Sequence, residues 1–428
     1  MLFSQFFGGT VMEIARQRYI QKLIDRKENG LVKVITGIRR CGKSYLLFHL
    51  YKNELLNMGI PSGHIIELAL DDISNIEYRN AIKLYNYVKT QIVDDGTYYV
   101  FLDEIQLLES NFADLVNGLL HIENLDIYVT GSNSKFLSSD ILTEFRGRGD
   151  EVRVFPFSFS EFVTAYDDVH TAWKDYYTYG GLPLVLTRKS DELKAEYLIS
   201  LFQNIYINDI KERNNIRTDD ELDILVDILA SATGSLTNPV KLSNSFKSMS
   251  QKTLSDKTVK LYLDYLTDAF LIEKASRFDV KGKKYISSPS KYYFEDVGLR
   301  NARLNFRQQE KNHIMENIIY TELRSRGYRV DVGVVETYET DITGTSKRKQ
   351  LEIDFIANKG SNKYYIQSAF EMASPEKARQ EKKSLNKLND SFRKFIIIKD
   401  DIKTSIDDNG LITMGIYDFL LNEKSLEI

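Results

Sequence analysis

One segment, from Gly37 to Ser44, restricts the fold of this chain more than any other part of its sequence. It reads GIRRCGKS, follows the β-branched run LVKVIT and precedes YLLFHLYKNELL, whose apolar residues recur with helical spacing. The pattern Gly-x-x-x-x-Gly-Lys-Ser between a strand and a helix is typical of a loop whose backbone N–H groups surround phosphates. The alternative, a glycine-rich turn without a ligand, does not require the flanking strand and helix. The sequence therefore predicts an α/β fold that binds a nucleotide.

Each residue type in this loop has a chemical reason to be there. Gly37 and Gly42 let the backbone turn its N–H groups inward. Lys43 can reach the β- and γ-phosphates, and the Ser44 hydroxyl can ligate Mg²⁺. The expected cofactors are therefore ATP and Mg²⁺. The residues that we expect at the nucleotide are Gly37, Arg40, Cys41, Gly42, Lys43, Ser44 and Tyr45.

A second apolar run ends in two acidic residues about sixty positions downstream. In YYVFLDEIQLL, residues 98–102 form the predicted strand, and Asp103 and Glu104 follow at its carboxyl end. Asp103 is expected to hold Mg²⁺ through water, and Glu104 is expected to orient and deprotonate the attacking water. A buried strand that ends in two acids has little other structural reason to exist.

A third strand, LDIYVTGSN, ends in a polar residue that could sense the γ-phosphate or the attacking water. That residue is Asn133, for which a turn or helix cap is the alternative. The following segment, FRGRGDEV, carries Arg146 and Arg148 between glycines. We expect one of them to act as an arginine finger donated to a neighbouring subunit. A solvent-exposed basic turn is the other interpretation.

Six segments of the chain, taken in order, resemble a family of bacterial and archaeal AAA-type P-loop ATPases. They are GIRRCGKS, FLDEIQ, TGSN, the FRGR segment, FPFSFSEF and YGGLPLVL. The resemblance extends from about Met12 through most of the chain. It implies a nucleotide-binding core, a helical lid, a winged helix and a further C-terminal domain of poorly defined function. The first three motifs are shared by many AAA proteins, whereas the Pro-Phe-Ser and Gly-Gly-Leu-Pro segments are more specific to this family. The resemblance does not imply a substrate.

Residues 241–300 read as a helix-turn-helix followed by a two-stranded wing. Ser255 or Asp256 is expected to cap the second helix, and a short first helix is expected from Leu242 to Phe246. The segment carries twelve Lys and Arg against seven Asp and Glu, a net charge of +5, which leaves −9 for the rest of the chain. Such a basic face suits contact with a phosphate backbone. A role in packing or partner binding remains the alternative.

Residues 310–400 alternate helix and strand in the layout of restriction-endonuclease-like domains. In that layout Glu316 lies on a helix, Asp354 ends a strand and Gln367 lies on the next strand, where acidic groups bind Mg²⁺. The catalytic lysine expected two positions after Gln367 is replaced by Ala369. Glu316 and Asp354 therefore form a possible vestigial metal site, and we expect nuclease activity to be absent or very slow. Lys382 and Lys383 on the next helix are the candidate replacements.

The predicted fold class is α/β, with a P-loop NTPase core built on a parallel sheet, a helical lid, a winged helix and a C-terminal α/β restriction-endonuclease-like domain. The expected boundaries are 12–165 for the core, 166–235 for the lid, 236–305 for the winged helix and 306–428 for the last domain. The first eleven residues show no pattern, which fits either a mobile terminus or a start codon placed too early.

Composition excludes several other classes of protein. The chain has 428 residues with a net charge of −4, and its lone cysteine, Cys41, rules out a disulfide framework or a cysteine-based metal site. Its five histidines are never closer than fifteen positions, which gives no metal-ligand spacing. No apolar run reaches eighteen residues, so no membrane partner is expected and the predicted location is cytoplasmic.

Two function classes follow from these observations. The first is an ATPase that hydrolyses ATP with Mg²⁺ as an oligomeric switch or motor and acts with DNA through its C-terminal half. The second is a regulatory ATPase whose C-terminal domains bind a protein partner without DNA. A small-molecule kinase has weaker support, because no acceptor-site pattern follows the phosphate loop.

Overall fold

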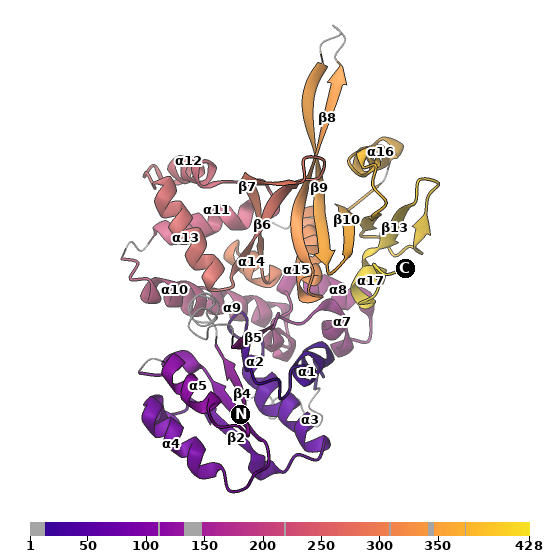
Figure 1. The fold of residues 1–428 in the computed structure, drawn as a ribbon. Coiled ribbons are helices and arrows are strands. Elements are labelled where there is room, and N and C mark those ends of the chain that lie inside the picture. The colour runs from indigo at the N-terminus through magenta and orange to yellow at the C-terminus, as the bar shows by residue number, and fades with distance from the viewer. Residues whose placement is uncertain are drawn as a thin grey trace. The chain divides into compact units, whose positions relative to one another are not determined.

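The computed structural model describes residues 13–109, 112–131, 148–217, 220–307, 310–340, 346–372 and 374–428 (Figure 1). The chain divides into two compact units, which we describe separately. The first unit comprises residues 1–156 with 268–270, and the second comprises 157–267 with 271–428. The predicted start near Met12, Asn133 and Arg146 lie outside the described residues.

The first unit is built on a five-stranded sheet in the order β2-β3-β4-β1-β5, in which every pair of neighbours is parallel. This arrangement confirms the predicted parallel-sheet core. The strands are β1 (Val32–Thr36), β2 (Ile65–Ala69), β3 (Tyr98–Asp103), β4 (Leu125–Thr130) and β5 (Gly149–Arg153). The nearly continuous burial of β1, β3 and β4 follows from parallel pairing, because the helices that connect such strands cover both faces of the sheet.

The helices of this unit cover alternate side chains of the strands. They are α1 (Gln17–Ile24), α2 (Lys43–Tyr45), a π-helical stretch (Leu46–Tyr51), α3 (Lys52–Asn57), α4 (Ala81–Gln91) and α5 (Phe112–Leu120). Val100 and Leu102 of β3 pack in one apolar cluster with residues of α4 and α5. Phe101 instead contacts Tyr51 and Tyr128, with ring centroids 5.9 and 5.3 Å away. Each face of β3 therefore has its own core.

The aromatic face of this sheet contains a buried polar network. Asp126 on β4 accepts hydrogen bonds from the Lys33 ammonium on β1 and, at 2.7 Å, from the Tyr128 hydroxyl. The hydroxyls of Tyr128 and Tyr51 are a further 2.7 Å apart. Burial lowers the pKa of Lys33, and the Asp126 charge opposes that shift. A buried pair of this kind is tolerated because each charge has a fixed partner.

The second unit contains an eight-stranded mixed sheet in the order β12-β13-β11-β10-β9-β8-β6-β7. Its strands are β6 (Ile272–Asp279), β7 (Lys284–Phe294), β8 (Arg329–Thr340), β9 (Ser346–Lys359), β10 (Asn362–Ala369), β11 (Arg393–Ile398), β12 (Ser405–Ile406) and β13 (Leu411–Gly415). The long β8–β9 hairpin extends well beyond the rest of the sheet (Figure 1). The three strands predicted after the helix that bears Glu316 are confirmed as β8, β9 and β10.

The helices of the second unit fall largely where the periodicity places them. They are α7 (Phe159–Phe162), α8 (Val169–Tyr179), α9 (Asp191–Leu201), α10 (Asn208–Arg213), α11 (Glu221–Ser231), α12 (Pro239–Ser250), α13 (Asp256–Asp268), α14 (Val297–Arg303), α15 (Lys311–Ser325), α16 (Pro375–Lys383) and α17 (Ile416–Leu421). Among the described residues of the chain, no helix is both long enough and apolar enough to cross a membrane.

Two helices, α12 and α13, lie at the residues predicted to form a helix-turn-helix, and the first of them is longer than expected. It begins at Pro239 rather than Leu242, because the Asn238 side chain caps it by accepting a hydrogen bond from the Lys241 N–H at 2.7 Å. Ser255 caps the second helix and accepts from the Thr258 N–H at 3.1 Å. The predicted two-stranded wing corresponds to β6 and β7.

The eight-stranded sheet runs across the boundary that we expected between residues 305 and 306. The register pairs Arg277, Phe278 and Asp279 of β6 in parallel with Val332, Gly333 and Val334 of β8. The wing hairpin and the C-terminal strands thus share one hydrogen-bonded sheet. The residues on the two sides of this expected boundary therefore contribute strands to the same sheet.

The Tyr-Gly-Gly-Leu-Pro segment has a packing role in the second unit. The buried Asp296 carboxylate caps α14 and accepts a hydrogen bond from the Gly181 N–H at 2.7 Å. Burial raises the pKa of Asp296 to about 6, while this N–H opposes the shift. A Cβ on Gly180, which has φ +73°, would lie 2.1 Å from an Asp296 oxygen. A Cβ on Gly298 would lie 2.0 Å from the Tyr179 carbonyl oxygen. The three glycines therefore permit close backbone contact.

We expect Gly298→Ala to destabilise the second unit, although alanine has the higher helix propensity. The propensity gain is about 1 kcal/mol, whereas overpacking against a backbone carbonyl typically costs about 1–3 kcal/mol or more. Thermal and urea denaturation of the full chain would measure the net effect. The control is Gly63→Ala, because a Cβ at Gly63 meets nothing within 4 Å. Equal stability of the two variants would contradict the packing role.

Candidate functional site

The loop between β1 and α2 has the backbone shape that the sequence pattern requires. Gly37 has φ +140° and Gly42 has φ +98°, both in a region that favours glycine. A Cβ on Gly37 would lie 2.1 Å from the Val154 carbonyl oxygen, so glycine is needed there for space as well. The loop is thus held tightly against the chain that follows β5.

Lys43 is the first residue of α2, and its ammonium lies inside the loop. The side chain is buried, and Nζ donates to the carbonyl oxygens of Gly37 at 2.9 Å and Ile38 at 3.1 Å. The aliphatic stem is therefore fixed while the charged end faces the middle of the loop. This is the position from which a lysine reaches phosphate oxygens.

A residue that sequence reasoning missed, Arg16, supports the loop from behind. Its guanidinium is buried and donates to the carbonyl oxygens of Cys41 at 3.3 Å and Phe155 at 2.6 Å. It also lies 4.5 Å from the centre of the Tyr19 ring. Nothing in the sequence marks Arg16, because its partners are distant along the chain.

The other loop residues named from the sequence have different surroundings. The Cys41 side chain is buried and its thiol donates to the Val154 carbonyl oxygen at 3.4 Å, so it packs against the chain. Arg40 is exposed. The Tyr45 hydroxyl bonds to Glu13 at 3.0 Å, and its ring stacks on His49.

Three oxygen-bearing side chains meet where β3 and β4 end beside the loop. The buried Asp103 carboxylate accepts hydrogen bonds from the hydroxyls of Thr130 and Ser44. Burial raises the pKa of Asp103, and these two hydrogen bonds oppose the shift. Thr130 was not expected from the sequence; its only signal is its place as the last residue of β4. Ser44 and Asp103 are thus brought together as predicted.

Glu104 follows directly and adopts an unusual backbone conformation. Its φ is +52°, which is uncommon for a residue with a side chain. The Glu104 N–H donates to the Thr130 hydroxyl at 3.1 Å, and the Gln106 amide donates to its half-buried carboxylate. Strained backbone held by hydrogen bonds is frequent at functional sites.

Arg148 lies where the strands of the parallel sheet begin, whereas the phosphate loop lies where they end. It precedes β5, and its carbonyl oxygen accepts from the N–H of Val32, the first residue of β1. The phosphate loop begins after Thr36, the last residue of β1, which places it about 13 Å further along the strand direction. The exposed Arg148 side chain is therefore poorly placed to reach its own chain's phosphates.

A second cluster of acidic side chains lies inside the other unit. Glu316 on α15 and Asp354 on β9 are brought together as the sequence predicted, and both are largely buried. The residue between them is Lys291 of β7. Its Nζ lies 2.8 Å from Glu316, 2.8 Å from Glu352 and 3.5 Å from Asp354. Lys291 was not expected from the sequence, because it is distant along the chain from Glu316 and Asp354; Glu352 lies two positions before Asp354 on β9 and was also not singled out.

The charges of this cluster influence one another strongly. Burial lowers the pKa of Lys291, but the surrounding carboxylates outweigh that effect and hold the pKa above its ordinary value. Burial, followed by the Glu316 charge, raises the pKa of Asp354 to about 8. The Tyr293 hydroxyl donates to Glu316 at 2.6 Å, and the Ser368 N–H donates to Asp354 at 2.8 Å. Every acidic group here therefore has a partner within the protein.

The remaining residues named for a nuclease-like site do not join the cluster. Gln367 donates weakly to Glu381 at 3.4 Å, and its buried Oε1 has no hydrogen-bond partner among the described residues. Ala369 is buried. Lys382 instead pairs with Asp407 at 2.9 Å. The described residues also contain no group of three or more His, Cys, Asp or Glu arranged to hold a metal ion.

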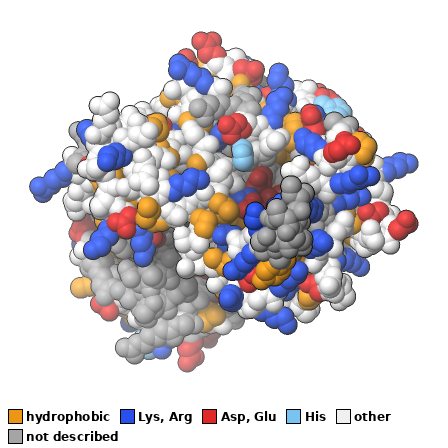
Figure 2. All heavy atoms as spheres, turned by 90° about the horizontal axis from the view of Figure 1, so that it is seen from above, with side chains coloured by type: hydrophobic (Ala, Val, Ile, Leu, Met, Phe, Trp, Pro, Cys, Tyr) orange, Lys and Arg blue, Asp and Glu red, His pale blue; other side chains and the backbone are white. Residues whose placement is uncertain are grey.

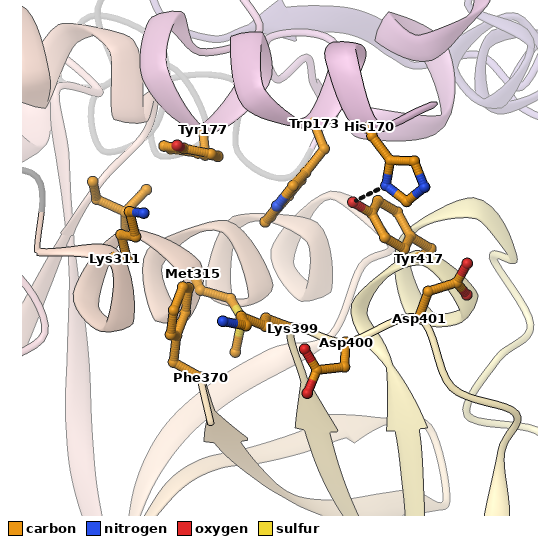
Figure 3. A pocket seen from close by; sticks show the side chains of 11 residues that line it. His170, Trp173, Tyr177, Lys311, Met315, Phe370, Lys399, Asp400, Asp401 and Tyr417 are labelled. Carbon is orange, nitrogen blue, oxygen red and sulfur yellow. Dashed lines mark hydrogen bonds between the residues drawn. The ribbon is translucent and has the colours of Figure 1, made fainter. Parts of the chain in front are cut away.

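An open pocket of about 350 Å³ lies elsewhere in the second unit (Figure 3). Trp173 and Tyr177 extend into it from α8, and Tyr417 of α17 bonds to His170 at 3.1 Å. Its charged lining residues are Lys311, Lys399, Asp400 and Asp401. Two positive and two negative charges balance, so the pocket has an aromatic lining without a positive field for phosphate.

Two family models match parts of this chain. Residues 29–163 match the family model described as "AAA domain", and residues 170–310 match "Domain of unknown function (DUF8612)". Among solved structures, the Aeropyrum pernix ORC1 protein in complex with DNA aligns with 68% of this chain and 92% of its own, at 11% identity and a TM-score of 0.29. Cdc6p from Pyrobaculum aerophilum aligns with 73% of this chain and 98% of its own, at 13% identity and a TM-score of 0.30.

Two relatives align over most of their length. An uncharacterized protein of Methanocaldococcus jannaschii is 30% identical over 84% of this chain and 78% of its own. An uncharacterized protein of Haemophilus influenzae is 34% identical over 95% of this chain and 98% of its own. This similarity shows that the chain belongs to the same family as these two proteins, and residues 29–163 of the chain, which include the phosphate loop, form an AAA-type P-loop domain.

Proposed function

We propose that this protein binds ATP with Mg²⁺ at the loop that follows β1, hydrolyses it, and uses the cycle as an oligomeric switch or motor acting with DNA through its C-terminal half. One observation carries the proposal. Lys43, Ser44 and Asp103 converge at the carboxyl edge of a parallel sheet, next to the constrained Glu104. That edge is where open α/β sheets bind their ligands.

The oxygen donors beside the loop fit Mg²⁺. The Ser44 hydroxyl and the Asp103 carboxylate already share a hydrogen bond, so both face one point, and both are oxygen ligands of the kind that Mg²⁺ prefers. When bound there, Mg²⁺ would neutralise charge on the phosphates. Lys43 would exchange its carbonyl partners for β- and γ-phosphate oxygens, and the loop N–H groups would bind the β-phosphate.

Glu104 is the proposed general base. Its carboxylate would accept a proton from the water that attacks the γ-phosphate. The Gln106 amide and the Thr130 hydroxyl hold the residue in place, so little reorganisation is needed at the moment of reaction. Asn133 is the proposed sensor, and Arg146 or Arg148 is the proposed finger from a neighbouring subunit.

For the second unit we propose a helical lid, a winged helix and a degenerate restriction-endonuclease-like domain. The lid comprises 166–235, the winged helix 236–305 and the last domain 306–428. The order α12, α13, β6, β7 supports the winged helix. The helix α15 with the strands β8, β9, β10 and β11 supports the nuclease-like layout.

Contact with DNA is supported by basic residues on two neighbouring hairpins. Both Lys281 in the wing and Arg348 in β9 hydrogen-bond to Glu336 of β8, so the hairpins lie side by side there. The exposed basic residues of this surface are Lys281, Lys283, Lys284, Lys347, Arg348 and Lys349. Figure 2 shows Lys and Arg side chains around the end of the β8–β9 hairpin. We call these six residues the basic hairpin surface; it is suited to a phosphate backbone.

A protein partner is the second candidate function, and the aromatic pocket favours it. The pocket presents Trp173, Tyr177 and Tyr417 with balanced charges. Such a surface suits an apolar side chain of a partner better than a polyanion. Trp173 is the only tryptophan of the chain, so its fluorescence reports on this pocket alone.

Lys43→Ala should weaken nucleotide binding about 10- to 100-fold, because a charge-assisted hydrogen bond contributes about 1.5–3 kcal/mol. Glu104→Gln should bind ATP normally but hydrolyse it about 10²–10⁴ times more slowly, since only the general base is removed. Equilibrium binding of a fluorescent ATP analogue and release of phosphate would measure the two effects. Equal loss of binding in both variants would contradict the division of roles.

Arg146→Ala and Arg148→Ala test the finger. A finger donated to the neighbour should leave ATP binding intact and slow hydrolysis by about 10³-fold or more. Mixing the affected variant with Glu104→Gln protein should restore part of the activity, because some interfaces then combine an intact base with an intact arginine. Each variant alone at the same total concentration is the control. No recovery, with monomers at every ATP concentration, would rule out a finger supplied by a neighbouring subunit.

Reversing two charges on the basic hairpin surface should weaken duplex binding. For Lys283→Glu with Lys284→Glu, we expect a lower affinity and a salt dependence reduced by about two units of slope, because each lost phosphate contact removes about 0.9. A salt series of electrophoretic shifts with random duplex would measure both. The matched control is Lys174→Glu with Lys189→Glu, two exposed lysines of the same unit. No shift in the wild type at low salt would favour the protein-partner function.

A further inference from the structure

The acidic cluster of the second unit has the ligand types of a nuclease metal site, but its centre is occupied by a side chain. Glu316 comes from a helix and Asp354 from a strand, as in the nuclease-like layout. The Lys291 ammonium lies between them and is almost completely buried. We propose that Lys291 replaces the divalent metal ion at this site as a permanent internal cation. The inference holds whether or not the protein hydrolyses ATP.

The distances within the cluster fit an ammonium group and do not fit a site that the ammonium shares with a metal ion. Lys291 Nζ is 2.8 Å from a Glu316 oxygen and 2.8 Å from a Glu352 oxygen, which are ordinary lengths for charged hydrogen bonds. It is 3.5 Å from Asp354. A magnesium ion needs about six oxygens near 2.1 Å and keeps several waters. An ion held by these same oxygens would lie against the ammonium, so the two cations exclude each other.

Two further hydrogen bonds to the carboxylates of the cluster also support the replacement of the metal ion by Lys291. Tyr293 donates to the Glu316 oxygen that already accepts from Lys291, and the Ser368 N–H donates to the second oxygen of Asp354. These donors take up carboxylate lone pairs that a metal and its waters would otherwise use. Ala369, a buried residue at the strand position expected for the catalytic lysine, brings no second cation to the cluster.

The burial of Lys291 also argues against a catalytic role. Its side chain is 3% exposed, and the partners of its ammonium among the residues that the structure describes belong to the cluster. A lysine that stabilises charge on a scissile phosphate must reach the substrate. Lys291 therefore acts within the protein, by neutralising carboxylates and joining β7 to α15 and β9.

Removing the ammonium should create a metal site. Lys291→Met keeps the length of the side chain and removes its charge, which leaves Glu316, Glu352 and Asp354 facing an uncharged space. Calorimetric titration of the full chain with Mn²⁺, without nucleotide, should show no site that depends on Asp354 in the wild type. It should show one new site per chain in Lys291→Met, and this site should be lost when Asp354→Asn is added. Lys194→Met is the matched control, because Lys194 is a buried lysine that faces Asp175 in the same unit.

Thermal melting keeps the test decisive if Lys291→Met folds poorly. The variant should melt at a lower temperature than the wild type and regain stability in millimolar Mn²⁺, whereas Lys194→Met should not respond. Wild-type protein that binds Mn²⁺ through Asp354 would overturn the inference, as would a folded Lys291→Met that binds none. Plasmid cleavage by the wild type that is lost in both Lys291→Met and Asp354→Asn would also overturn it, by making Lys291 catalytic.

Discussion

Parallel pairing within the first unit is the constraint on which the nucleotide site depends. Because β1, β3 and β4 run in the same direction, their carboxyl ends lie at one edge, and residues far apart in the sequence meet there. The hydrogen bonds that Asp103 accepts from Thr130 and Ser44 join the end of β3 to the end of β4 and to the helix α2 that follows the phosphate loop. The same pairing puts Arg148 at the other edge. The direction of the strands, rather than any single contact, therefore separates Arg148 from the residues of the loop.

The sequence predicted those features of the fold and the site that depend on residues close together in the chain. The phosphate loop, the acidic strand end and the succession of α15, β8, β9 and β10 follow from patterns spanning a few residues. It did not predict contacts in which a single polar residue meets a partner that is distant along the chain. Arg16, Thr130 and Lys291 each look ordinary in the chain, and their roles depend on folding that brings in Phe155, Asp103 and Glu316. Periodicity predicts which face of an element is buried, but not which charges meet inside.

Three buried lysines of this protein are each paired with carboxylates. Lys33 faces Asp126, Lys194 faces Asp175, and Lys291 faces several carboxylates. Such pairs add little net stability, because desolvation offsets most of the attraction, but removing one partner typically costs about 3–5 kcal/mol. Their main effect is therefore to penalise every arrangement in which the partners do not meet. In the second unit this requirement links β7 with α15 and β9, which are separated by long stretches of chain.

The parallel contact between β6 and β8 has a consequence for how such a protein can change over evolution. Domains that are joined by a linker can be exchanged by recombination, because each keeps its own hydrogen bonds. Here an exchange near residue 305 would leave two strands with unpaired backbone groups, an arrangement prone to aggregation. The segment from α12 to β7 and the C-terminal strands are thus expected to be inherited together. A new specificity would have to arise through surface substitutions rather than by acquiring a ready-made domain.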